Sequence, residues 1–332
     1  MSTMRAVGYR VARPVTDPES LIDLTLARPV PGATDILVEV RAVSVNPVDA
    51  KQRIGSGDFP DGRVLGYDAA GVVAEVGPAV TRFKPGDEVF YAGDVFRNGS
   101  NAEFQAVDEQ IVALKPASLS FTEAAAIPLT AVTAWEGLFD RLQVGREEPS
   151  PLLVLGGAGG VASMVIQLAR QLTRLEIIAT ASRPESRAWV TELGAHHVVD
   201  HTIPLADQVL GLAPDGVRYV FSAYTKGLED QLFRAMAPES DLVMIDSGFD
   251  AQALKQKSIA LHWEWMFTRP VYRTASRIRQ HELLTEVARM VDAGALRTTL
   301  GTVLHGLSAD VLREGHRLIE TGRTTGKIVV EF

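Results

Sequence analysis

The 332-residue chain contains no cysteine. This absence excludes disulfide bonds and a thiolate nucleophile, and it also excludes cysteine-ligated zinc and iron–sulfur sites. If the protein carries out redox chemistry, a bound cofactor rather than a protein thiol must supply it.

Other features are missing as well. No apolar run approaches the ~18 residues that a bilayer requires, and the N-terminus lacks the charged-then-apolar pattern of a secretory signal. The chain has a formal net charge of −8 and no block of Lys and Arg, which argues against nucleic-acid binding. We therefore expect a cytoplasmic protein that acts on a small molecule and binds neither membranes nor nucleic acids.

The most informative motif is a glycine turn after the apolar run Leu152–Leu155. Gly157, Gly159 and Ala162 match the G-x-G-x-x-G/A spacing, which lets backbone N–H groups at a helix N-terminus approach a pyrophosphate. A turn that packs a helix on a strand for structural reasons alone would look similar. We interpret the motif as a dinucleotide site. Its candidate residues are Gly157, Ala158, Gly159, Gly160 and Val161.

The residues after this turn support a dinucleotide-binding βαβ unit. Met164–Leu172 has apolar residues at helical spacing, and Glu176–Ala181 reads as an Ile-rich strand. Ser182, Arg183 and Arg187 follow where NAD-selective folds carry an acidic residue for the ribose 2′-OH. Two arginines beside a serine suit a 2′-phosphate, so the pattern favours NADPH; a solvated helix start is the alternative.

Two patterns of elements divide the chain. From Arg5 to Ala113, short β-type runs alternate with Gly, Pro and Asp turns, which predicts a mostly-β region. From about Ala131 to Pro270, strands alternate with helical patterns, which predicts a parallel sheet. The remaining chain predicts two amphipathic helices and a closing strand, over Ala275–Ala293, Ala309–Thr321 and Lys327–Phe332.

Ordered motifs along the whole chain carry a family resemblance. Besides the glycine turn, they are Val45–Asp49, Gly66–Val73, Lys84–Val89, Gly99–Phe104, Pro128–Trp135 and Gly326–Val330. With these motifs the chain resembles the medium-chain dehydrogenase/reductase superfamily, in its zinc-free quinone oxidoreductase branch, and specifically the zinc-type alcohol dehydrogenase-like proteins. The resemblance implies an α/β fold with a GroES-like, mostly-β catalytic domain of residues 1–129 and 274–332. A Rossmann domain with a doubly wound parallel sheet, residues 130–273, would be inserted into it.

The resemblance also bears on metal binding. Zinc alcohol dehydrogenases carry Cys where this chain has Asn46 and His where it has Tyr67, and their other zinc ligands include cysteines that cannot exist here. The resemblance therefore implies no zinc. Neighbouring His196 and His197 at the start of a strand should point to opposite faces, so we do not expect them to form a replacement metal site with His201.

Without a metal, hydride transfer requires an acceptor in which the charge developing on oxygen is delocalised. The implied function is an NADPH-dependent oxidoreductase that reduces quinones or α,β-unsaturated carbonyls. Asn46 and Tyr67, at the emptied ligand positions, are the candidate catalytic donors; a turn residue and a core aromatic residue are the alternative interpretations. The resemblance and the strand ends add candidate cofactor contacts at Thr133, His201, Asp246, Ser247 and Lys327.

Two other functions stay open: a non-catalytic NADPH-binding or redox-sensing protein, and zinc-type alcohol dehydrogenase activity, whose ligands the chain lacks. The oligomeric state is suggested by the segment Ser258–Phe267, which contains Trp263 and Trp265 and is predicted to be a strand. In the superfamily this strand pairs with a second subunit, so the resemblance implies a homodimer. A core strand and a lid over the substrate pocket are the alternatives.

Overall fold

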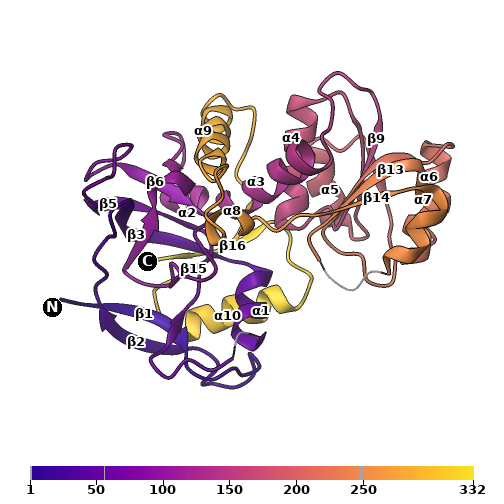
Figure 1. The fold of residues 1–332 in the computed structure, drawn as a ribbon. Coiled ribbons are helices and arrows are strands. Elements are labelled where there is room, and N and C mark those ends of the chain that lie inside the picture. Colours follow the sequence, from indigo (N-terminus) through magenta and orange to yellow (C-terminus); the bar gives the residue numbers. More distant parts are fainter. Residues whose placement is uncertain (1, 56, 247–249) are drawn as a thin grey trace. The chain divides into compact units, whose positions relative to one another are not determined.

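The structure, a computed structural model, describes residues 2–55, 57–246 and 250–332. The chain forms two compact units (Figure 1). One comprises residues 1–132 and 267–332, and we call it the β-rich unit. The other comprises residues 133–266, and we call it the parallel-sheet unit.

A seven-stranded sheet forms the centre of the β-rich unit, in the order β15-β16-β3-β5-β6-β8, with β7 paired to β3. Strand β3 is antiparallel to β5, β7 and β16, so the C-terminal strand lies directly beside residues of the N-terminal region. The strands are β3 (Asp35–Val45), β5 (Ala69–Val76), β6 (Glu88–Tyr91), β7 (Phe104–Asp108), β8 (Val112–Leu114), β15 (Leu300–His305) and β16 (Lys327–Glu331).

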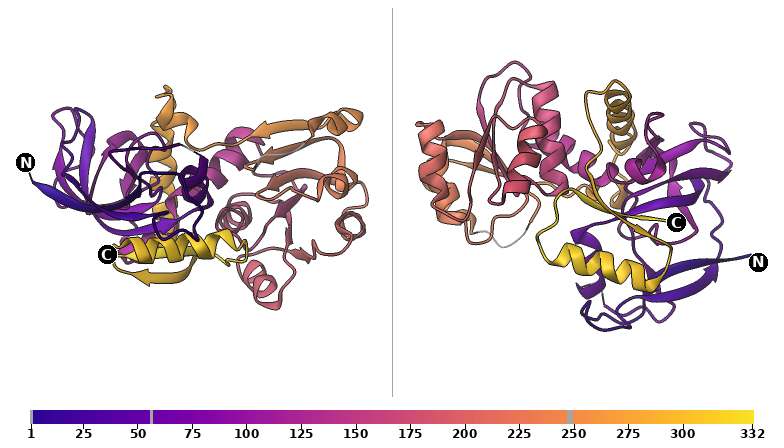
Figure 2. Two further views of the ribbon diagram at one scale, coloured as in Figure 1. Left: turned by 90° about the horizontal axis from the view of Figure 1, so that it is seen from below. Right: turned by 180° about the vertical axis from the view of Figure 1, so that it is seen from behind.

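A smaller sheet of the same unit has the order β2-β1-β4, formed by β2 (Ile22–Ala27), β1 (Thr3–Tyr9) and β4 (Arg63–Val64). The helices with residues in this unit are α1 (Pro47–Gly55), α2 (Phe121–Ala124), α3 (Pro128–Trp135), α8 (Thr268–Val271), α9 (Arg279–Asp292) and α10 (Ala309–Glu320), with a short 3-10 turn, η1 (Glu109–Ile111). Helix α10 packs against α1, β3 and β16 (Figure 2).

Six parallel strands form the sheet of the other unit, in the order β11-β10-β9-β12-β13-β14. They are β9 (Pro151–Leu155), β10 (Glu176–Thr180), β11 (His197–Val199), β12 (Val217–Ser222), β13 (Met236–Met244) and β14 (Ala260–Trp263). In chain order this is the 3-2-1-4-5-6 arrangement of doubly wound dinucleotide folds. The predicted α/β fold class is confirmed.

Helices connect the successive strands of this sheet. They are α4 (Gly160–Leu172), α5 (Pro184–Glu192), α6 (Leu205–Leu212) and α7 (Glu229–Ala235), with a 3-10 helix, η3 (Ala251–Lys257); a π-helix, η2 (Glu136–Arg141), precedes β9. On one face, Leu153 and Val220 of the sheet form a buried cluster with Val209 of α6 and Leu232 of α7. Because side chains alternate along a strand, Leu152 points to the opposite face.

Some elements differ from the predicted bounds. The Val45–Asp49 motif, predicted as a turn, leads into helix α1, whose first residue is Pro47; proline is tolerated there because the first helical N–H groups have no intrahelical acceptor. The predicted strand Ser258–Phe267 is shorter, since β14 ends at Trp263 and α8 begins at Thr268. Strand β15 was not predicted, because its partly exposed residues do not alternate between apolar and polar.

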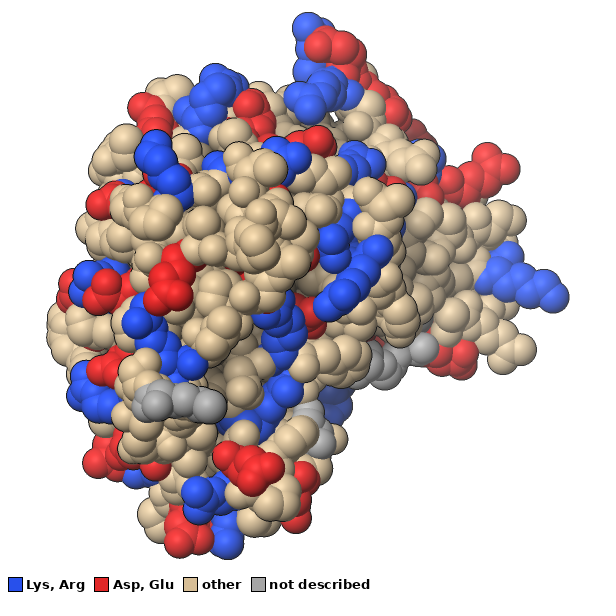
Figure 3. All heavy atoms as spheres, turned by 60° about the vertical axis from the view of Figure 1, so that its left-hand side comes forward, with Lys and Arg blue, Asp and Glu red and all other residues tan. Residues whose placement is uncertain are grey.

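Charged side chains of both signs lie close together on the surface. Figure 3 shows one face of the molecule, on which Lys and Arg side chains are interspersed with Asp and Glu. In the part of the chain that the structure describes, no helix is both long and apolar enough to cross a membrane.

Candidate functional site

The glycine turn connects β9 to α4 and is fixed against β10. Gly156 has φ of 70°, in the left-handed region that favours glycine. A Cβ atom at Gly157 would lie only 2.7 Å from the carbonyl oxygen of Thr180. The N–H of Gly156 donates to Thr180 Oγ1 at 2.9 Å, and the N–H of Gly157 donates to the Thr180 carbonyl at 3.1 Å. The local geometry therefore requires small residues here.

Helix α4 offers an N-terminus suited to an anion. Its N-cap residue is Gly159, and no side chain caps the first turn. Residues 158–161 are only partly buried, so their backbone is accessible. Uncapped N–H groups at the positive end of a 13-residue helix form a site for a phosphate group. The predicted residues 157–161 thus fit the pyrophosphate of a dinucleotide.

Basic side chains lie at the carboxyl end of β10. Arg187 donates to the carbonyls of Ala181 at 3.1 Å and Val198 at 3.2 Å, which holds it beside the ends of β10 and β11. The N–H of Arg183 donates to Ser186 Oγ at 3.2 Å at the start of α5. Ser182 is partly buried. No carboxylate stands in this stretch before position 185, so the residues fit a 2′-phosphate.

The other predicted cofactor contacts are scattered. His201 is exposed after β11, and Thr133 is buried in α3. The Asp246 carboxylate accepts from the N–H of Thr225 at 2.7 Å and from its Oγ1 at 2.9 Å, so it supports the loop after β12. Ser247 lies outside the described residues. Lys327 belongs to the β-rich unit.

In the β-rich unit, the candidate catalytic residue Asn46 is part of a buried network. Lys327 Nζ donates to Asn46 Oδ1 and, at 2.8 Å, to Asp68 Oδ2. Asp68 Oδ2 also accepts from Ser44 Oγ at 2.7 Å and from Asn46 Nδ2 at 3.1 Å. Lys327 is 4% exposed and Asp68 is fully buried. A buried ammonium and a buried carboxylate therefore compensate each other here.

Asp49 ties helix α1 to the neighbouring segment. Its carboxylate accepts from the backbone N–H of Asn46 at 2.8 Å and from that of Gly66 at 2.9 Å. Burial raises the pKa of Asp49 to about 7, against the opposing effects of these two hydrogen bonds and of Lys327. Asp49 thus has a positioning role, in which it orders the backbone on both sides of the network.

Tyr67, the other candidate catalytic residue, is fully buried. Its hydroxyl donates to the Val95 carbonyl at 3.4 Å, and its ring packs edge-on against Phe267 with 5.4 Å between the centroids. Burial, and next the nearby Asp49, raise the pKa of the Tyr67 hydroxyl above its ordinary value. The phenol is therefore protonated at all ordinary pH values, and it can donate a hydrogen bond but cannot act as a base.

The two candidate catalytic residues differ in how their polar groups are engaged. The Asn46 amide is held at both ends, its oxygen by Lys327 and its nitrogen by Asp68. Tyr67 donates a long hydrogen bond to the Val95 carbonyl, and its hydroxyl also interacts with the Arg63 side chain. Sequence reasoning missed Asp68, although it stands inside the Gly66–Val73 motif, because its partner Lys327 is 259 residues away.

Within the described residues, no group of three or more His, Asp and Glu side chains could hold a metal ion. His196 Nδ1 accepts from the N–H of Ile177 at 2.9 Å, whereas His197 Nε2 lies 2.9 Å from Glu176. The two neighbouring rings thus have separate partners.

Family models and curated relatives identify the class of protein. Residues 32–176 match the alcohol dehydrogenase GroES-like domain, and residues 193–330 match a zinc-binding dehydrogenase family. The chain is 40% identical over 314 residues to a zinc-type alcohol dehydrogenase-like protein of Staphylococcus aureus (strain MSSA476), covering 92% of this chain and 93% of that protein. It is 32% identical to 2-methylene-furan-3-one reductase of Solanum lycopersicum, covering 89% and 71%.

Solved structures agree with this assignment. A crystal structure from Rhizobium etli CFN 42, provisionally described as a zinc-dependent alcohol dehydrogenase, has a TM-score of 0.96 and 49% identity, covering 100% of this chain and 99% of that one. A mycobacterial protein complexed with NADPH has a TM-score of 0.85 and 26% identity, covering 100% of both chains. The chain therefore belongs to the medium-chain dehydrogenase/reductase superfamily and is an oxidoreductase, as the sequence motifs predicted.

Proposed function

We propose that the protein reduces quinones or α,β-unsaturated carbonyls with NADPH and without catalytic zinc. The observation that carries this proposal is the network at Asn46, where zinc enzymes of the superfamily hold their metal. Lys327 already supplies a buried positive charge there, and it is paired with Asp68. The tomato relative, named as a reductase of a methylene-furanone, gives support to an enone substrate.

NADPH, when bound, would supply the hydride. The glycine turn, residues 157–161, would hold its pyrophosphate, and Ser182, Arg183 and Arg187 would hold its 2′-phosphate. Support for NADPH over NADH comes from the missing carboxylate after β10 and from the mycobacterial neighbour that is complexed with NADPH. Thr133, His201, Asp246 and Lys327 stay predicted contacts.

Side chains of the β-rich unit would stabilise the charge that develops on the acceptor. Hydride transfer to the β-carbon of an enone leaves negative charge on the carbonyl oxygen, which a hydrogen-bond donor can stabilise. Tyr67 is the residue we assign as that donor, because its protonated hydroxyl donates a long bond of 3.4 Å to the Val95 carbonyl, which the oxygen of the acceptor can replace. Asn46 would then shape the site through the amide orientation that Lys327 imposes.

The direct test is NADPH oxidation by chelator-treated protein, with an ortho-quinone and a 2-alkenal as parallel acceptors and NADH as the cofactor control. We expect turnover that survives chelation and prefers NADPH. No turnover with either acceptor, together with tight NADPH binding, would favour the non-catalytic binding protein. Activity on a simple alcohol that chelation abolishes and zinc restores would favour the alcohol dehydrogenase alternative.

A homodimer formed through β14 is also part of the proposal. This strand is the last in its sheet, and Trp263 on it is 53% exposed. An unpaired edge with an exposed aromatic residue is stabilised when a second copy pairs with it. Sedimentation at equilibrium should give twice the chain mass, and Trp263→Lys should shift the protein toward the monomer; a wild-type monomer at all concentrations would exclude the dimer.

A further inference from the structure

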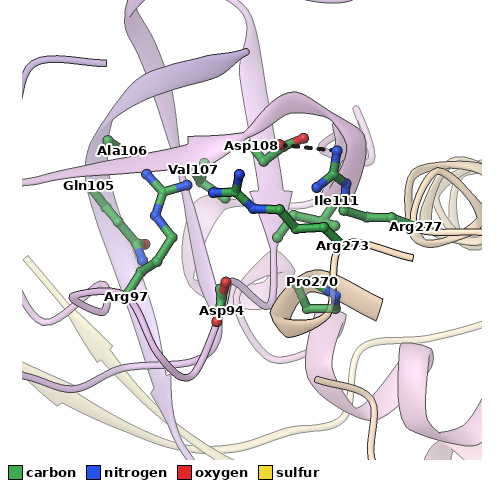
Figure 4. A pocket seen from close by; sticks show the side chains of 10 residues that line it. All are labelled: Asp94, Arg97, Gln105, Ala106, Val107, Asp108, Ile111, Pro270, Arg273 and Arg277. Atoms are coloured by element: carbon green, nitrogen blue, oxygen red, sulfur yellow. Dashed lines mark ion pairs between the residues drawn. The ribbon is translucent and has the colours of Figure 1, made fainter. Parts of the chain in front are cut away.

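A pocket in the β-rich unit is lined by three arginines from separate segments (Figure 4). Arg97 follows β6, Arg273 follows α8, and Arg277 precedes α9. Strand β7 forms one wall of the pocket. None of these residues belongs to the candidate cofactor site or to the network at Asn46, so the pocket has no role in the proposed reaction.

Two of the arginines have acidic partners. Arg97 donates to both carboxylate oxygens of Asp35, at 2.9 and 2.8 Å. Arg277 lies 3.5 Å from Asp108, and its Nε donates to Gln110 Oε1 at 3.3 Å. Asp108 also accepts from the N–H of Gln110 at 2.9 Å. Asp35 is therefore already paired with Arg97, and Asp108 is already paired with Arg277 and with the N–H of Gln110.

Arg273 differs from the other two. Across residues 2–55, 57–246 and 250–332, its guanidinium makes no hydrogen bond or ion pair, although its charge helps to lower the pKa of the nearby Asp35. Figure 4 shows this guanidinium between those of Arg97 and Arg277, so three like charges face one space. Asp94, which also lines the pocket, lies lower in the view, and its Oδ1 accepts from the N–H of Phe96 at 2.9 Å. Adjacent like charges repel unless an anion lies between them.

The backbone at Arg273 gives no reason for an arginine. Its φ is 46°, in the left-handed region. Its N–H donates to the Pro270 carbonyl at 3.3 Å, and the N–H of Thr274 donates to the Arg269 carbonyl at 3.2 Å. This is the geometry of a helix C-terminus at which glycine is the usual residue. An arginine is less favourable than glycine at this position, yet it projects a cation into the pocket.

We propose that this pocket binds a small multivalent oxyanion, through phosphate or carboxylate oxygens that accept from Arg273. The N–H groups of Arg97 and Arg277 that Asp35 and Asp108 leave unused would complete the site. A guanidinium is planar and carries several N–H donors, so it bonds both kinds of oxyanion with two parallel hydrogen bonds. Asp35, Asp94 and Asp108 offset part of the repulsion between the three arginines, and an oxyanion would offset more of it while it accepts from Arg273.

The experiment measures the thermal midpoint of the full-length protein against increasing inorganic phosphate or malonate, at constant ionic strength. We expect a saturable rise with at least one anion, and the stronger of the two assigns the site to phosphate or to carboxylate. Arg273→Gly should weaken the binding about tenfold, the loss of one charge-assisted interaction. Arg174→Met, which removes an exposed arginine outside the pocket and outside the candidate cofactor site, should leave the response unchanged.

The Arg273→Gly variant is informative because glycine adopts the left-handed backbone conformation at position 273 without strain. Arg273→Gly should unfold at the same or a higher temperature without anions, so that a lost response cannot come from a damaged fold. Arg273→Lys keeps the charge but not the planar fork, and it should bind with intermediate affinity. The absence of a saturable response in the wild type, or a response of equal size in Arg273→Gly, would overturn the proposal.

Discussion

The two units prepare their candidate sites in opposite ways. In the parallel-sheet unit, the glycine turn offers backbone N–H groups from residues that are neighbours in sequence, and it stays accessible. In the β-rich unit, the network at Asn46 consists of buried side chains, and Lys327 and Asn46 stand 281 positions apart. A candidate site for a phosphate group can thus be local and open, whereas the buried network at Asn46 depends on charges that the fold brings together.

The largest expected effect comes from breaking the buried ion pair. Lys327→Met leaves the buried Asp68 carboxylate without its cation and should lower the free energy of unfolding by about 3–5 kcal/mol, measured by urea denaturation. The double variant with Asp68→Asn should recover part of this loss. If Lys327 instead serves mainly as the predicted cofactor contact, the single variant would unfold normally and bind NADPH weakly.

A substitution in the glycine turn should weaken cofactor binding rather than lower the stability of the fold. In Gly157→Ala, the new Cβ would lie 2.7 Å from the Thr180 carbonyl, so the turn must move and NADPH binding should weaken at least about tenfold. Gly211→Ala in helix α6 is the matched control, because a Cβ there has no neighbour within 4 Å. Fluorescence titration with NADPH gives both dissociation constants, and equal values would refute the assigned role of the turn.

A third variant tests the choice of cofactor at the same edge of the sheet. Arg187→Met removes one guanidinium beside the carbonyls of Ala181 and Val198. NADPH affinity should fall about tenfold while NADH affinity stays constant, since only NADPH carries the 2′-phosphate. An equal loss for both cofactors would mean that Arg187 serves only to support the strand ends.

The smallest effect concerns the pH dependence of stability. Because burial raises the folded-state pKa of Asp49 to about 7, well above its unfolded value, the folded protein binds this proton more tightly. The contribution of Asp49 therefore favours folding at low pH and is lost as pH rises toward about 7. Between pH 6 and 7, Asp49→Asn should flatten the decline in unfolding free energy by about 1 kcal/mol. Parallel pH profiles of the two proteins would argue against a protonated Asp49.

The sequence predicts the parallel-sheet unit well, and for a physical reason. The glycine turn, the helix after it and the strand Glu176–Thr180 are specified by contiguous residues, and the structure contains all three. The pairing of Lys327 with Asp68 depends on β16 lying beside β3, which no local pattern encodes. The position of Arg273 between Arg97 and Arg277 was likewise not predictable, since residues from separate segments line the pocket.

Zinc content measured together with turnover tests the central claim most directly. Purified protein, expressed in zinc-supplemented medium, is analysed for bound metal and then assayed with NADPH and the better of the two acceptors. Our account predicts far less than one zinc per chain and a turnover rate independent of the residual metal. One tightly bound zinc per chain, with activity that rises in proportion to it, would contradict the account.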